Sequence, residues 1–168
     1  VVVMPGAVPH AAPTRFHAIA FGEIGATETV LSEEKATKGN VRTWSASADI
    51  VSFFAHGHYG EDVPAGVIRL ADGDVNPAEH GEAWRGMERV ELWACRSGVN
   101  VSYDPLTPWV DEVFGLDVVF HQLGVRSTIG TFWNVPDLVT ALLVREYRHA
   151  LTRGRGAPAS LADAMRWW

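Results

Sequence analysis

The stretch IVSFFA, residues 50–55, predicts the kind of fold that this chain adopts. It is an almost unbroken apolar run, and such runs are typical of strands buried on both faces of a parallel sheet. A second run, RVELWA at residues 89–94, has the same character. The first run leads into His56 and Gly57, and the second leads directly into Cys95. Both predicted strands therefore end in residues that can carry chemistry.

The rest of the chain alternates in the same way between strand-like and helix-like segments. This alternation predicts an α/β fold with a mainly parallel β-sheet flanked by helices. The residues from His56 to Pro64 and those from 97 to 108 are predicted to be loops, because glycine, proline and charged residues gather there. Further strands are expected at 1–4, 27–31, 66–70 and 127–132, and helices at 13–23, 37–44, 77–84, 110–123 and 137–151, followed by a last helix capped by Ser160.

Length and composition narrow the possible functions. With 168 residues, 47% of them hydrophobic, the chain is expected to form one domain over residues 1–168. A formal net charge of −6 argues against broad binding to nucleic acid or to anionic membranes. No apolar run approaches the ~20 residues of a membrane span, and no secretory signal is visible, so we expect a cytoplasmic protein.

The number of cysteines and the residues at the start of the chain lead to two further expectations. Cys95 is the single cysteine, which excludes an intramolecular disulfide and any zinc site built from several cysteines. Three β-branched residues stand at the very start, in Val1–Met4, and look like a strand that has lost its upstream neighbours. The chain is therefore expected to be a fragment that lacks an N-terminal region.

His56 and Cys95 form the constellation that carries chemistry. Reactive groups collect beyond the carboxyl ends of the strands in open parallel sheets, and both residues follow such ends. An imidazole close to a thiol converts the thiol into a nucleophile at neutral pH. The N–H groups of Gly57 and Cys95 would then form an oxyanion hole. Such a dyad needs neither a metal nor a cofactor.

Two alternative interpretations of these residues compete with a catalytic dyad. A lone cysteine is often an inert part of the core, so Cys95 need not be reactive. Two histidines, His56 and His58, also stand close to Glu61 and Asp62, and such a group is able to bind zinc or iron, although no third well-placed ligand is evident.

Four segments, in order, resemble the CHAT family of caspase-like cysteine proteases, which belongs with the caspases, separases and gingipains. A strand ends in a histidine–glycine pair, a hairpin leads into a helix, a second strand ends in an alanine–cysteine pair, and a C-terminal part carries a tryptophan-containing turn. These segments are ADIVSFFAHGHYG (48–60), VIRLADGDVNPAEH (67–80), VELWACRSG (90–98) and residues 115–168.

The resemblance implies a cysteine endopeptidase in which His56 is the catalytic histidine and Cys95 the nucleophile. It also implies a protein substrate, a role in bacterial defence, and activation by a partner or by an N-terminal region of helical repeats. Arg96 and Ser97 depart from the residues usual after the family's cysteine, and the loop 99–109 is unusual. The alternative is a catalytically silent scaffold that uses the same fold to hold a partner.

The turn after the strand at 127–132 is expected to help form the substrate pocket. Separases, which cleave after arginine, carry an aspartate at the place that Asp137 matches in sequence, and a carboxylate pairs best with a guanidinium. Trp133 would form the apolar side of the pocket. The competing interpretation is that Asp137 only stabilises the start of a helix.

Overall fold

The computed structural model describes residues 1–4, 28–60, 63–94, 97 and 115–167. These residues belong to two compact units, of which the first holds all the strands and the second holds the two C-terminal helices. Each unit is described separately below. The predicted helix at 13–23 and most of the predicted loop at 97–108 lie outside the described residues.

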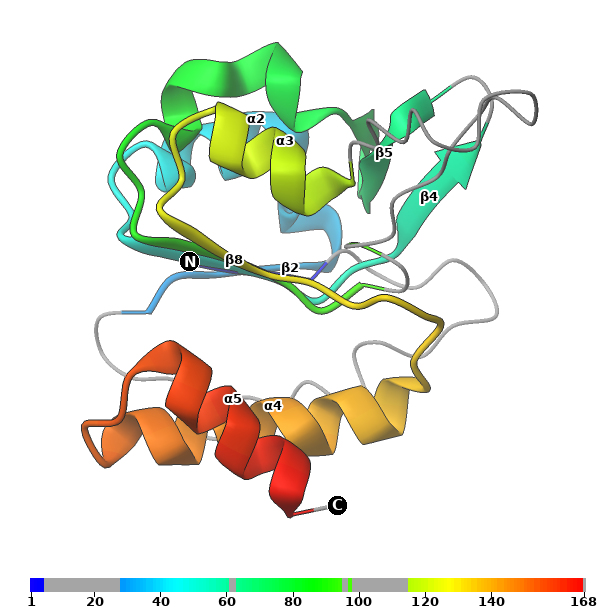
Figure 1. Ribbon diagram of the computed structural model, residues 1–168. Helices are drawn as coiled ribbons and strands as arrows, with labels where there is room; N and C mark the ends of the chain where they lie inside the picture. The colour runs from blue at the N-terminus through cyan, green and yellow to red at the C-terminus, as the bar shows by residue number, and fades with distance from the viewer. Residues whose placement is uncertain (5–27, 61–62, 95–96, 98–114, 168) are drawn as a thin grey trace, which may run out of the picture. The chain divides into compact units, whose positions relative to one another are not determined.

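A five-stranded sheet forms the centre of the first unit (Figure 1). Its strand order is β2-β1-β3-β7-β8, and every neighbouring pair is parallel. This arrangement confirms the predicted α/β fold with a parallel sheet. The strands are β1 (Val2–Met4), β2 (Val30–Ser32), β3 (Ile50–Phe53), β7 (Arg89–Leu92) and β8 (Ser127–Ile129).

Three helical segments lie on one face of this sheet (Figure 1). They are α2 (Lys38–Ser45), η2 (Pro77–Trp84) and α3 (Leu116–Gln122), and a short turn of 3₁₀ helix, η1 (Glu33–Lys35), precedes them. Thr37 and Asn76 begin α2 and η2, because their side chains accept hydrogen bonds from backbone N–H groups of the first turn.

The core lies between the sheet and these helices. Alternate residues of the central strands point into it, and Val51, Phe53, Val90 and Leu92 are fully buried. Trp84 packs among them, with its ring centre 6.2 Å from that of Phe53 and 5.0 Å from that of Phe120. The apolar runs of the sequence are therefore explained by a strand face that packs against aromatic side chains.

A small antiparallel sheet follows β3 and stands apart from the main sheet (Figure 1). It consists of β4 (Gly57–Gly60), β5 (Val63–Leu70) and β6 (Gly73–Val75). The prediction of a loop from His56 to Pro64 was therefore wrong for most of its length. Its glycines and charged residues concealed the strands, because this pairing rests on backbone hydrogen bonds rather than on an alternating apolar pattern.

The second unit contains α4 (Asp137–Thr152) and α5 (Ala157–Arg166), which pack against each other. Apolar residues of α4 such as Val144 and Tyr147 are fully buried. The prediction that Ser160 caps the last helix was wrong, because Gly156 stands at the cap and the helix begins at Ala157. Ser160 is a buried residue inside α5.

The helix predicted at 110–123 also begins later than expected in the described part of the chain. Gly115 stands at its N-terminal cap, so α3 starts at Leu116. Its end was predicted correctly: Gly124, with a φ of +96°, follows the helix in the left-handed region that glycine adopts without strain.

Candidate active site

His56 lies where the chain leaves the main sheet and enters the antiparallel hairpin. The strand before it is held in the sheet, since the N–H of Phe54 donates to the carbonyl of Val3 at 2.9 Å. The hairpin after it is held as well, because the carbonyl of His56 accepts from the N–H of Arg69 at 2.9 Å. The backbone of His56 is thus fixed on both sides.

The ring of His56 carries a buried nitrogen that has no hydrogen-bond partner in the described part of the chain. Its Nε2 atom is shielded from solvent and forms no hydrogen bond with any other described residue. Leaving a buried polar atom unpaired costs about 1–3 kcal/mol, so such atoms are uncommon away from functional sites. Its lack of a structural partner among the described residues makes this nitrogen a candidate for a chemical role.

The N–H of Gly57 points away from the hairpin partner strand. Gly57 pairs with Ile68 on β5, and the neighbouring Arg69 N–H to His56 carbonyl bond makes this a non-hydrogen-bonded pair. In such a pair the N–H groups of the two residues face away from each other's strand. The Gly57 N–H is therefore not used in the ladder with β5, as an oxyanion donor requires.

The strand that leads to Cys95 is the direct neighbour of the strand that leads to His56. Leu92 on β7 pairs with Phe53 on β3, and the N–H of Trp93 donates to the carbonyl of Phe53 at 2.9 Å. The pairing thus continues to the carboxyl ends of both strands. Cys95 itself, together with Arg96, lies outside the described residues.

A set of hydrogen bonds joins the residues on either side of positions 95 and 96 in the sequence. The carbonyl of Ala94 accepts from the N–H of Ser97 at 3.3 Å and from the hydroxyl of Thr131. The Ser97 hydroxyl donates to the carbonyl of Leu92 at 3.0 Å and accepts from the N–H of Thr131 at 3.0 Å. Sequence analysis treated Ser97 only as a departure from the family pattern and missed Thr131. The sequence pattern gives little indication that these two hydroxyl groups are buried and bonded, because a hydroxyl in a loop is usually solvated.

The two predicted pocket residues stand on different units. Trp133 follows β8 in the first unit, and it is 64% exposed beside Phe132, which is 66% exposed. Asp137 is the first residue of α4 in the second unit and is partly buried. Pro136 occupies the N-cap position, so Asp137 lies in the first turn of the helix rather than at its cap.

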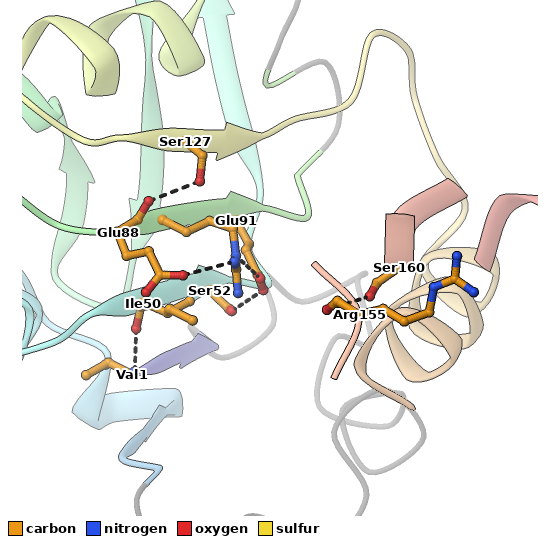
Figure 2. A network of polar contacts seen from close by, with 9 residues as sticks. Val1, Ile50, Ser52, Glu88, Glu91, Ser127, Arg155 and Ser160 are labelled. Carbon is orange, nitrogen blue, oxygen red and sulfur yellow. Dashed lines mark hydrogen bonds and ion pairs between the residues drawn. The ribbon is translucent and has the colours of Figure 1, made fainter. Parts of the chain in front are cut away.

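A buried ionic cluster, drawn in Figure 2, is formed by residues of β3 and β7 that alternate along the strands with the residues of the aromatic core. Glu91 accepts a hydrogen bond from the Ser52 hydroxyl at 2.6 Å and from Arg89 Nε at 2.9 Å. Glu91 and Arg89 are only 3% and 6% exposed. The sequence pattern suggested an apolar strand here and did not reveal this cluster.

The metal hypothesis depends partly on residues that are not described. Glu61 and Asp62 lie outside the described residues, as does the side chain of His58. Among the side chains that the structure describes, no group of three or more histidine, cysteine, aspartate or glutamate residues could hold a metal ion. In the same part of the chain, no helix has the length and apolar character that crossing a membrane requires.

Comparison with known protein families gives a match over nearly the whole chain. The model of the CHAT domain family matches residues 5–168. A comparison with curated proteins gave no match.

Proposed function

This chain belongs to the CHAT domain family, which is associated with caspase-like peptidases, and on that premise we propose that it is a cysteine endopeptidase. Its dyad consists of His56 and Cys95. The proposal rests above all on the buried Nε2 of His56 at the carboxyl end of β3, which has no hydrogen-bond partner among the described residues. The adjacent strand β7 leads to Cys95, which is the only thiol of the chain.

In the proposed reaction, the sulfur of Cys95 attacks the carbonyl carbon of the scissile peptide bond. The C–N bond breaks, a thioester forms, and the leaving amine takes up the proton that His56 carries from the thiol. Water then hydrolyses the thioester and restores the thiol. The N–H groups of Gly57 and Cys95 stabilise the negative charge that develops on the carbonyl oxygen.

We also propose that Asp137 and Trp133 each contribute to recognition of the substrate residue before the scissile bond. Asp137 supplies a carboxylate that favours arginine over lysine, and Trp133 supplies an apolar surface. The large exposed fraction of the Trp133 side chain, 64%, supports a role in contact with another molecule. The protein substrate, activation by a partner or by a helical-repeat region, and a role in bacterial defence are what the family resemblance implies.

A comparison of newly formed protein termini tests the proposal. The full-length protein and its Cys95→Ala and His56→Ala variants are added to an extract of the source cells, and new termini are identified by mass spectrometry. His149→Ala is the matched control, because His149 is an exposed histidine of α4. We expect cleavage by the wild type and by the control, and none by the two dyad variants. Cleavage that survives Cys95→Ala, or its absence from the wild type, overturns the proposal, and the latter outcome favours the scaffold.

A further inference from the structure

The carbonyl oxygen of Ala94, directly before Cys95, is held from two sides. One donor is the N–H of Ser97, and the other is the hydroxyl of Thr131, which follows β8. Positions 95 and 96 therefore stand between two residues, Ala94 and Ser97, that are tied both to each other and to Thr131.

The hydroxyl of Ser97 completes a closed set of bonds. It donates to the carbonyl of Leu92, the last residue of β7, and accepts from the N–H of Thr131. Ser97 is completely buried. Because a buried donor or acceptor that loses its partner costs about 1–3 kcal/mol, each of these bonds stabilises the observed arrangement against movement of its partners. Polar contacts thus hold both ends of the turn, Ala94 and Ser97, in place.

We propose that Ser97 and Thr131 are positioning residues that hold the turn carrying Cys95 in its reactive geometry, an inference that rests on the proposed function. Three peptide links join Ala94 to Ser97, and fixing both ends limits where the residues between them can lie. Reaction rates depend steeply on such placement, since a displacement of about 1 Å can cost about a hundredfold in rate.

The same arrangement couples the cysteine turn to the edge strand of the sheet. Thr131 follows β8, and the chain then continues to the exposed residues Phe132 and Trp133. The proposed nucleophile and the proposed substrate-binding residue Trp133 are thus attached to one hydrogen-bonded unit.

The test uses the rate of Cys95 alkylation by iodoacetamide as a function of pH, which requires no knowledge of the natural substrate. Thr131→Val keeps the size of the side chain but removes the hydroxyl donor, Thr131→Ser restores that donor, and Ser97→Ala removes the second link. Ser127→Ala is the matched control. Its hydroxyl also joins the β8 region to a backbone carbonyl, that of Glu88 at 3.0 Å, but at the opposite end of the strands (Figure 2).

We expect the wild-type thiol to react well below the ordinary thiol midpoint of about pH 8.5. Thr131→Val and Ser97→Ala should move the midpoint upward by about one pH unit, which slows alkylation about tenfold at pH values below the wild-type midpoint. Thr131→Ser and Ser127→Ala should match the wild type. With a cleaved peptide as substrate, kcat should fall in Thr131→Val while KM changes little. General destabilisation alone changes neither the alkylation midpoint nor the kcat of the molecules that remain folded.

Two different outcomes distinguish the two proposals. An ordinary midpoint in the wild type means that no base activates Cys95, which overturns the proposed function and this inference with it. A low wild-type midpoint that stays unchanged in both Thr131→Val and Ser97→Ala overturns the positioning role alone. If Thr131→Val does not fold, Ser97→Ala provides the same comparison.

Discussion

Phe53 and Leu92 lie opposite each other in the register of β3 and β7. Three residues further along each strand, the sequence reaches His56 and Cys95. The candidate dyad is therefore tied to the register of two parallel strands, and a shift of either strand by one residue would also turn the apolar face of that strand away from the core. The packing that specifies the fold thus specifies the positions of both strand ends.

The first prediction concerns the buried ionic cluster of Ser52, Arg89 and Glu91. Glu91→Ala should lower the free energy of unfolding by about 3–5 kcal/mol, because Arg89 is left as a buried charge without this partner. Ser52 loses its acceptor in the same variant. Urea denaturation followed by circular dichroism measures the change.

Glu88→Ala is the control for this prediction. Its carboxylate lies 3.6 Å from Arg89 but is 60% exposed, so its removal should change the urea midpoint little. Equal midpoints for the two variants would contradict the view that burial makes the Glu91 contact important.

The second prediction concerns the aromatic core. Trp84→Ala should destabilise the protein by about 3–5 kcal/mol, since it empties a space between Phe53 and Phe120. The stability of Trp84→Phe should lie between those of Trp84→Ala and the wild type. Phenylalanine fills part of the space, but the indole N–H that donates to the carbonyl of Pro77 at 3.0 Å is lost. Trp44→Ala is the control, as that tryptophan is 45% exposed. A thermal unfolding series ranks the three variants, and a Trp44 variant as unstable as Trp84→Ala would refute this account.

Sequence reasoning succeeded where a long apolar run controlled the structure. The strands around Phe53 and Leu92 were predicted because their burial requires an apolar pattern that is visible in the residues themselves. The strands at Gly57–Gly60 and Val63–Leu70 were missed in part, because backbone pairing holds them and leaves little trace in the sequence.

The candidate site was likewise predictable only in part. The histidine and the cysteine could be identified because each follows an apolar strand. The contacts of Thr131 with Ala94 and Ser97 could not, since they join residues 34 or more positions apart and depend on which strands are neighbours. The burial of the ionic pair of Glu91 and Arg89 could not be predicted for a related reason, because it depends on which parts of the folded chain cover that face of the sheet.

The third prediction uses two glycines with opposite backbone requirements. Gly124 has a φ of +96°, so Gly124→Ala should cost about 1 kcal/mol or more in stability. Gly39 lies inside α2 with open space around the position of an added Cβ, so Gly39→Ala should raise stability by about 0.5–1 kcal/mol. Each variant is the control for the other in urea denaturation, and changes of the same sign would contradict the conformational argument.

The last prediction separates the two interpretations of Asp137. As a pocket residue, its carboxylate pairs with an arginine of the substrate, and Asp137→Asn should abolish the preference for basic residues while an uncharged substrate is cut as before. As a helix residue only, it interacts with the N-terminal end of the α4 dipole, and the same variant should lose merely about 0.3–1 kcal/mol of stability. Asp117→Asn is the matched control, because Asp117 is the acidic residue in the first turn of α3. Cleavage profiles of a peptide library, measured beside urea denaturation, distinguish the two. A profile that is identical for the wild type and Asp137→Asn would leave Asp137 with the helix role alone.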